Sequence, residues 1–217
     1  MFADRPDAGR QLAGALGHLR GQEVVVLGLP RGGVPVAYEV AVALGAPLDV
    51  IVVRKLGFPG RPELAMGAVG EDGTLVLQRE VLLRGRVSEQ ELRRVEDQER
   101  ALVQSRVAQL RQGRPRVDLH GRVSVVVDDG LATGATARAA CRVARRLGAL
   151  RVVLAVPVAP ADALDRIGEA DEAVCVSAPP GFTAVGLHYR DFSPTIDEEV
   201  VDLLNAAPGR PLTEPQA

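Results

Sequence analysis

The sequence predicts an α/β fold, built on a doubly wound and mainly parallel sheet. Short apolar runs rich in β-branched residues alternate with longer segments whose apolar residues recur at helical spacing. Strands that are apolar on both faces and joined by helices are typical of a parallel sheet that is covered on both sides. The predicted strands are 23–29, 48–53, 122–127, 151–158 and 172–177.

Helices are predicted in the segments that link and flank these strands. Segment 33–44 follows the first strand, 134–147 follows the third, and 161–167 precedes the last. Segment 7–19 opens the chain and 196–204 closes it, so helices are available for both faces of the sheet.

Residues 56–121 interrupt this alternation and are predicted to form an insertion. Two short strand-like pieces, 64–69 and 74–78, flank an EDG sequence that suits a hairpin turn. The preceding segment 56–63 contains glycine and proline and is predicted to be flexible, and we expect it to act as a lid together with the hairpin.

The rest of the insertion is predicted to be a long helix within 81–113. Ser88 and Glu91 have the spacing of a capping box. The helix carries too many charges to be buried all round, so it covers the sheet or contacts a partner. We therefore expect one domain over 1–207, including the insertion, and a frayed tail at 208–217.

Composition excludes several classes of protein. A net charge of −2 does not favour a nucleic-acid-binding surface, and no run reaches the roughly 18 apolar residues that a membrane span needs. The polar start does not resemble a secretory signal, so we expect a cytoplasmic protein. Cys141 and Cys175 lack CxxC spacing and are predicted to be reduced, and the three histidines form no metal-ligand pattern.

The loops after the strands are the candidate ligand sites, because ligands of such sheets bind at the carboxyl ends of the strands. PRGG at 30–33 follows the first strand and precedes a helix. Arg31 offers a guanidinium, while Gly32 and Gly33 leave the backbone open, which together favour an anion site. A plain strand-to-helix turn is the alternative. The loop is neither a Walker loop nor a GxGxxG motif.

Arg54 and Lys55 follow the second predicted strand. Lys55 is the lone lysine among 26 basic residues. A lysine kept among so many arginines suggests a need for a compact ammonium group. Two solvated cations at a strand end are the alternative, but their place at the expected ligand edge favours a functional role.

The third predicted strand ends in VVVDDGLATGAT, at 125–136. Hydroxyls and amides of Thr133, Gly134 and Thr136, in a turn that enters a helix, are suited to a terminal phosphate. Asp128 and Asp129 would repel that anion, but they can accept hydrogen bonds from a sugar diol or help to hold magnesium. A ribose 5-phosphate satisfies both halves of the motif.

VVVDDGLATGAT resembles the signature of the type I phosphoribosyltransferase family. PRGG resembles the family's pyrophosphate loop, and Arg54-Lys55 resembles a cationic pair of adenine-type members, so the resemblance covers about 20–160. It implies a phosphoribosyltransferase-like core with a small hood over the acceptor site. It also implies that the catalytic residues are Asp128, Asp129 and Lys55. The two aspartates would bind the ribose hydroxyls of phosphoribosyl pyrophosphate and help to hold Mg²⁺, directly or indirectly. The 5-phosphate would be bound by Ala132, Thr133, Gly134, Ala135 and Thr136, and the pyrophosphate by Arg31, Gly32 and Gly33, with Arg54 and Lys55 balancing its charge.

Two positions depart from the family pattern. The branch that uses hypoxanthine and guanine typically has aspartate where this chain has Ala132, which disfavours 6-oxopurine acceptors. Adenine-type members also carry alanine there. Ala135 stands where the family often has glycine, which implies a tighter phosphate pocket.

The implied activity is transfer of ribose 5-phosphate to a nitrogenous base or related acceptor, with release of pyrophosphate, as in nucleotide salvage. The alternative is a regulatory protein that senses phosphoribosyl pyrophosphate without catalysis, although the sequence shows no DNA-binding module. A nicotinamide oxidoreductase is disfavoured, because the Gly-rich fingerprint is missing. Homo-oligomer formation stays open.

An aromatic cluster after the last strand has two interpretations. Phe182, Tyr189 and Phe192 are suited to stacking on a flat base, or to packing as a small satellite core under a loop. The polar residues between them, His188, Arg190 and Asp191, either contact an acceptor or are simply exposed.

Overall fold

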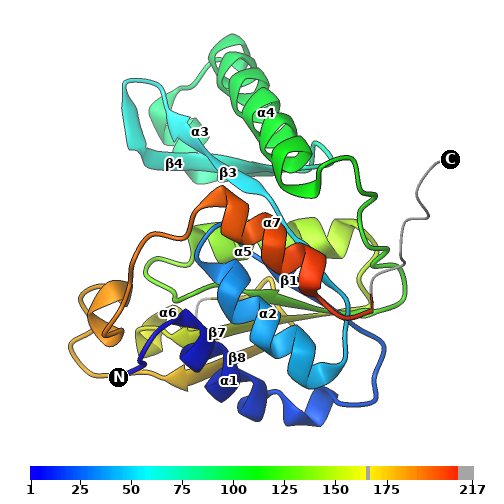
Figure 1. The fold of residues 1–217 in the computed structure, drawn as a ribbon. Coiled ribbons are helices and arrows are strands. Elements are labelled where there is room, and N and C mark those ends of the chain that lie inside the picture. The colour runs from blue at the N-terminus through cyan, green and yellow to red at the C-terminus, as the bar shows by residue number, and fades with distance from the viewer. Residues whose placement is uncertain (165–166, 210–217) are drawn as a thin grey trace, which may run out of the picture.

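Five parallel strands form the main sheet of this computed structural model, which describes residues 1–164 and 167–209 (Figure 1). Their order is β2–β1–β6–β7–β8, and every neighbouring pair is parallel, as predicted. The strands are β1 (Val24–Gly28), β2 (Leu48–Val50), β6 (Val123–Val127), β7 (Arg151–Val158) and β8 (Glu172–Ser177). The strand order reverses between β1 and β6, so the ligand edge of this sheet is expected where these two strands end.

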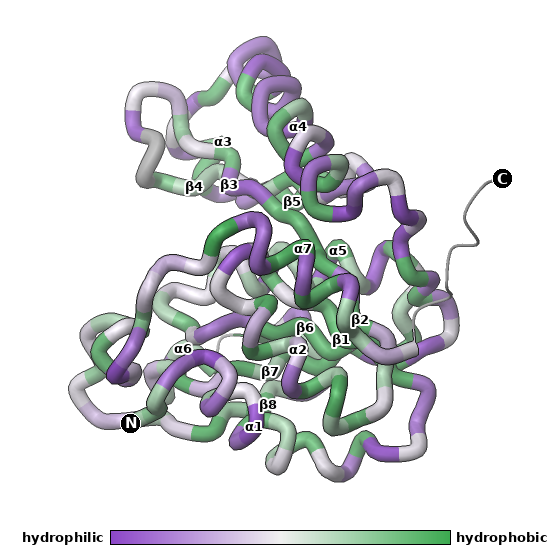
Figure 2. Tube along the Cα trace, viewed as in Figure 1, coloured by the Kyte–Doolittle hydropathy of each residue, from purple (hydrophilic) through white to green (hydrophobic). Residues whose placement is uncertain are grey.

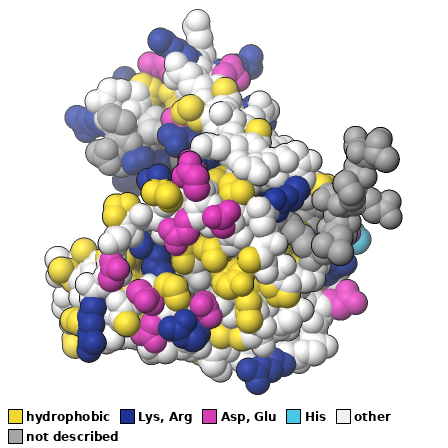
Figure 3. All heavy atoms as spheres, in the orientation of Figure 1, with side chains coloured by type: hydrophobic (Ala, Val, Ile, Leu, Met, Phe, Trp, Pro, Cys, Tyr) yellow, Lys and Arg dark blue, Asp and Glu magenta, His cyan; other side chains and the backbone are white. Residues whose placement is uncertain are grey.

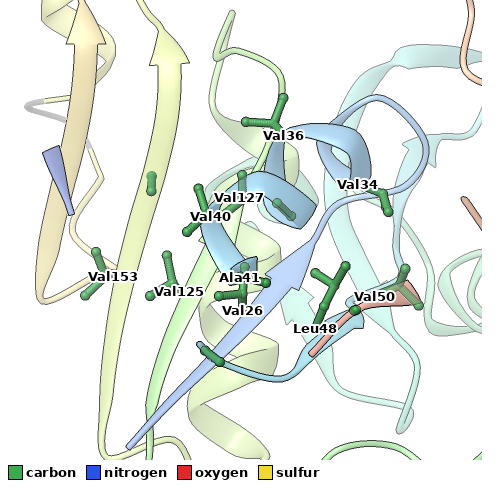
Figure 4. Packing of buried hydrophobic residues seen from close by; sticks show 14 of the residues in the cluster. Val26, Val34, Val36, Val40, Ala41, Leu48, Val50, Val125, Val127 and Val153 are labelled. Carbon is green, nitrogen blue, oxygen red and sulfur yellow. The ribbon is translucent and has the colours of Figure 1, made fainter. Parts of the chain in front are cut away.

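Helices cover both faces of the main sheet. Buried side chains of α1, α2 and α7 share one apolar cluster with alternate strand residues, and those of α5 and α6 share the other. Figure 4 shows Val26 and Val125 of neighbouring strands beside Val40 and Ala41 of α2. The helices are α1 (Arg5–Ala15), α2 (Gly33–Leu44), α5 (Ala135–Arg146), α6 (Ala161–Leu164) and α7 (Asp197–Ala206), with 3₁₀ turns η1 (Gly17–Leu19) and η2 (Val185–His188).

The insertion forms a second, antiparallel sheet with two helices beside it. Its strands are β3 (Val53–Phe58), β4 (Arg61–Gly70) and β5 (Leu75–Leu77), and its helices are α3 (Arg79–Gly85) and α4 (Glu89–Arg111). In Figure 1 the insertion stands above one edge of the main sheet. Figure 2 shows that α4 is largely hydrophilic, whereas β1 and β6 are hydrophobic along their length.

Three predictions for this region were wrong. The run 48–53 is not one strand: β2 ends at Val50, and Val53 already belongs to β3. Segment 56–63 is not a loop, because β3 and β4 pair across it as a hairpin with a turn at Gly60, which has φ of 73°. The helical segment 81–113 is not continuous: the long helix predicted from Ser88 is present as α4, but residues 81–85 belong to α3, and Arg86 with φ of 50° separates the two.

Other local predictions were confirmed. The capping box of Ser88 and Glu91 is present at the start of α4. Cys141 and Cys175 are free, and burial raises the pKa of the Cys141 thiol to about 12, which keeps it protonated. Segment 161–167 is helical at Ala161–Leu164, and its residues 165–166 lie outside the described part of the chain. Among the described helices, none has the length and apolar character that crossing a bilayer requires.

A buried ion cluster attaches the insertion to the main sheet. Arg111, at the end of α4, donates from Nε to Asp49 Oδ1 of β2 at 3.0 Å. The same guanidinium binds Glu71, in the turn between β4 and β5, and donates to the Val50 carbonyl at 3.0 Å. Asp49 is fully buried and Glu71 is 4% exposed, and the positive charge of Arg111 offsets part of the cost of burying both carboxylates.

Candidate active site

The loops after β1 and β6 lie against each other at the switch point of the sheet. A side-chain Cβ at Gly32 would stand 2.0 Å from Asp129 Oδ2, and one at Gly33 would stand 2.6 Å from the Val127 carbonyl oxygen. Gly33 therefore has no room for a side chain beside the backbone of the neighbouring loop, whereas a side chain at Gly32 would displace the Asp129 carboxylate. The predicted reason was close approach of a ligand; the structure shows close approach of the neighbouring loop.

The two aspartates of this loop are in different surroundings. Asp128 Oδ1 accepts a hydrogen bond from the Asp129 N–H at 2.9 Å. Asp129 Oδ2 accepts one from Arg5 Nε, also at 2.9 Å. Burial raises the pKa of Asp128 well above its ordinary value, with a further contribution from the Asp129 charge. Burial also raises the pKa of Asp129, but Arg5 opposes that shift.

Arg5 is a residue of this site that the sequence did not reveal. It lies in the first turn of α1, and 124 positions separate it from Asp129. Its guanidinium also donates to the Ser193 carbonyl at 2.7 Å and lies 4.0 Å from the centre of the Phe192 ring. No local pattern in the chain signals a contact between such distant segments.

The aromatic cluster is mainly a packed satellite core. Tyr189 is 6% exposed, shares a cluster with Phe2 and Val158, and donates from its hydroxyl to the Asp129 carbonyl at 2.6 Å. Burial raises the pKa of this hydroxyl, so it stays a hydrogen-bond donor. Phe182 instead stacks on His188, with ring centres 5.2 Å apart.

The predicted phosphate loop enters α5 directly. Gly134 has φ of 75°, and no side chain caps the helix, whose first hydrogen bond runs from the Arg138 N–H to the Gly134 carbonyl. The amides of the first helical turn therefore point toward the loop without intrahelical acceptors. Gly134 is buried, and the other predicted contact residues are exposed around it: Ala132, Thr133, Ala135 and Thr136.

Two cavities adjoin these loops. The larger, of about 580 Å³, lies between the second sheet and the start of α5, and Lys55, Thr133 and Ala135 are among its lining residues. The smaller, of about 300 Å³, is lined by residues of all three predicted loops: Pro30, Arg54 and Thr136. Both volumes are in the range of small-molecule sites.

Arg54 and Lys55 were predicted to follow a strand of the main sheet, but they lie within β3 of the second sheet. They nevertheless line the larger cavity, because the insertion turns β3 back toward α5. Arg54 forms an ion pair with Glu99 of α4. Arg31 is half exposed and lies 3.8 Å from Asp197 Oδ1, at the start of α7.

A magnesium ion would find limited protein ligands here. Among the described residues, no group of three His, Cys, Asp or Glu side chains could hold a metal. The carboxylate pair of Asp128 and Asp129 fits magnesium only in the common mode in which one or two carboxylates share the ion with substrate phosphates and water. Asp128 is the better candidate, since Asp129 is engaged by Arg5.

This open parallel sheet defines an α/β protein with an acidic pair and a Gly-rich loop at its switch point, the place where ligands of such sheets bind. Residues 6–177 match the model of the phosphoribosyl transferase domain, and the chain belongs to that family.

Similar proteins support the same assignment. Two proteins from Mycobacterium tuberculosis strains, each named "Putative phosphoribosyl transferase", are 56% identical to this chain over 208 residues, which is 95% of this chain and 47% of theirs. The chain thus spans about half the length of these curated relatives. The crystal structure of TT1426 from Thermus thermophilus has a TM-score of 0.85 at 47% identity, covering 96% of this chain and all of that one.

A more distant structure shares the fold alone. It is a hypothetical protein from Neisseria gonorrhoeae, solved with bound ppGpp, with a TM-score of 0.50 at 13% identity. The alignment covers 95% of this chain and 96% of that one.

Proposed function

We propose that this protein transfers ribose 5-phosphate from phosphoribosyl pyrophosphate to a nitrogen acceptor, with Mg²⁺ and with release of diphosphate. The observation that carries the proposal is the meeting of three separate loops on one cavity, through Pro30, Arg54 and Thr136. The acidic pair lies against the first of these loops, at Gly32.

Each loop has a role that matches its chemistry. The exposed hydroxyls and amides of 132–136 bind the 5-phosphate at the start of α5. The Asp128 and Asp129 carboxylates accept hydrogen bonds from the ribose diol. Loop 30–33 binds the diphosphate, together with the cations Arg54 and Lys55.

The reaction needs positioning more than covalent catalysis. A bond from the acceptor nitrogen to C1 of the ribose forms while the bond from C1 to the diphosphate oxygen breaks, and the bonding electrons leave with the diphosphate. The ring carries positive charge in the transition state, which the aspartates beside the diol stabilise. Magnesium, when bound, would supply further charge balance for the leaving group. The insertion lines the larger cavity with β3, β4 and β5 and the smaller cavity with β3 and α4, and it would exclude water from them.

The acceptor class is narrowed by one position. Ala132 lacks the carboxylate that recognises 6-oxopurines in the family, so we propose another nitrogenous acceptor within nucleotide salvage. Both cysteines are free thiols, which suits a reducing, cytoplasmic compartment.

The test is an assay of diphosphate release with Mg²⁺, phosphoribosyl pyrophosphate and a panel of bases, and we expect release that depends on one class of base. The double variant Asp128→Asn, Asp129→Asn should lose about 100-fold or more of this activity. Asp202→Asn, an exposed aspartate of α7, is the control that should change nothing.

Calorimetry on the same proteins decides the assignment of the loops. Unchanged donor binding in the double aspartate variant would show that the diol does not bind there. Tight donor binding without release under any base would favour a sensor over an enzyme.

A further inference from the structure

Asp197, the first residue of α7, lies among basic and amide side chains from two other elements. Arg106 of α4 binds its carboxylate with both terminal nitrogens, and the bond from Nη2 to Oδ1 is 2.6 Å long. Gln109 donates to Oδ2 at 2.8 Å, and Arg31 Nη1 lies 3.8 Å from Oδ1. On the face shown in Figure 3, acidic and basic side chains gather over the start of α7, directly below the insertion.

The same arginine faces the smaller cavity. Leu102, Ser105, Arg106 and Gln109 line it from one face of α4, at helical spacing. Arg54 and Pro30 line it from β3 and from the loop after β1. None of the described residues that line this cavity is acidic, whereas two are arginines. An anion that entered it would therefore meet two guanidinium groups.

The position of the Asp197 carboxylate indicates what that anion would replace. A guanidinium binds carboxylate and phosphate in the same two-pronged geometry. Arg106 is bound in this way, and Arg31 Nη1 lies 3.8 Å from the same carboxylate. Asp197 thus occupies Arg106 as a phosphate group would, with Arg31 close enough to contact that group as well.

We propose that Arg106 is a further diphosphate-binding residue and that Asp197 is an internal substitute anion, which must release Arg106 and Arg31 before diphosphate binds. The inference rests on the proposed function, since it assigns a new residue and a competitor to the same site. The Arg106–Asp197 pair joins the insertion to α7. Diphosphate binding to Arg106 would break this pair, so Arg106 can bind either diphosphate or α7 but not both.

The test measures the affinity of the whole chain for inorganic pyrophosphate with Mg²⁺, by calorimetry. Asp197→Asn keeps the size of the side chain but removes the competing charge. This variant should bind pyrophosphate about 3–10-fold more tightly, because the state in which Asp197 occupies Arg106 no longer lowers the apparent affinity. Arg106→Gln should bind about 10-fold more weakly, since one charge-assisted pair is lost. In the double variant, the gain from Asp197→Asn should be largely absent.

Glu172→Gln is the matched control. Glu172 also lies between two basic side chains, Arg151 and His18, but at the amino end of β8, on the opposite edge of the sheet. It should leave the affinity unchanged, and thermal melting should show that every variant is folded.

The outcomes separate the two hypotheses. Unchanged or weaker binding by Asp197→Asn, with normal binding by the wild type, would overturn the substitute anion and leave the proposed function standing. Normal binding by Arg106→Gln would overturn the new binding residue in the same way. A wild type that binds neither pyrophosphate nor phosphoribosyl pyrophosphate would contradict both proposals.

Discussion

The two sides of the candidate site differ in how far charged pairs add to apolar packing in holding them in place. On the sheet side, strands β1 and β6 are buried along their length. The loops that follow them pack tightly, because Gly32 lies against the Asp129 side chain and Gly33 against the Val127 carbonyl. On the insertion side, apolar residues such as Leu56, Met66 and Val103 share a buried cluster with the main sheet, and charged pairs add to this attachment. Arg111 binds two buried carboxylates and Arg106 binds Asp197. Close packing allows few alternative arrangements, whereas an ion pair can be exchanged for a pair with a ligand.

The largest loss of stability is expected from a substitution of Arg111 on the insertion side. Arg111→Ala removes the cation that binds both Asp49 and Glu71 in their buried positions, and breaking a buried pair in this way costs about 3–5 kcal/mol of the free energy of unfolding. Arg93→Ala removes an exposed pair with Glu89 on the same insertion and should have no measurable effect. Urea unfolding of the two variants beside the wild type gives both values.

The pH dependence shows whether charge is responsible. Burial already raises the pKa of Glu71, and the loss of Arg111 would raise it further. The destabilisation in Arg111→Ala should therefore shrink as the pH falls through that raised pKa and Glu71 becomes neutral. A loss that is the same at every pH would mean that packing of the arginine stem matters instead.

The same contrast explains what the sequence could predict about the fold. The strands of the main sheet follow from runs of buried β-branched residues, which local patterns record. The end of β2 was missed because Ile51 and Val52 are also fully or nearly fully buried, although they lie outside the sheet. An apolar pattern reports burial and not hydrogen bonding, so it could not locate that strand end.

The candidate site likewise has one part that local sequence patterns indicate and another part that they do not. Loops 30–33 and 128–136 could be proposed from the sequence because their chemistry is local in the chain. Their partners were missed, since Arg5 is 124 residues from Asp129 and Arg106 is 91 residues from Asp197. The insertion misled for another reason: glycine and proline at 57–60 suggested a flexible segment, but they form a tight turn between two strands.

A medium effect is expected where the two loops of the sheet side touch. Gly32→Ala and Gly33→Ala each force a methyl group into space that Asp129 or the Val127 carbonyl occupies, which should cost about 1–3 kcal/mol. Gly14→Ala is the matched control, because no atom lies within 4 Å of the added Cβ and its helix should gain about 0.5–1 kcal/mol. Thermal melting tests the opposite signs, and equal behaviour of all three variants would contradict the packing argument.

The smallest expected effect concerns Asp128, where stability and activity should move in opposite directions. Because burial raises the pKa of Asp128 above its ordinary value of 3.8, the folded state binds the proton more tightly than the unfolded state does. The contribution of this group to stability is then highest below pH 3.8 and falls as the pH rises through the raised pKa. Asp128→Asn removes this loss and should gain on the order of 1 kcal/mol at neutral pH, or about 2–4 °C in Tm.

Asp191→Asn provides the comparison of opposite sign, because hydrogen bonds from Ser193 lower the pKa of the exposed Asp191. That carboxylate stabilises the fold above its ordinary pKa and loses its contribution as the pH falls, so its asparagine variant should be the less stable protein at neutral pH. Melting curves without magnesium at pH 7 and near pH 3 measure both differences, which should shrink at the lower pH. If Asp128→Asn lowers Tm at pH 7, the buried carboxylate is stabilised by its surroundings, and the sheet side of the site would depend on charge as the insertion side does.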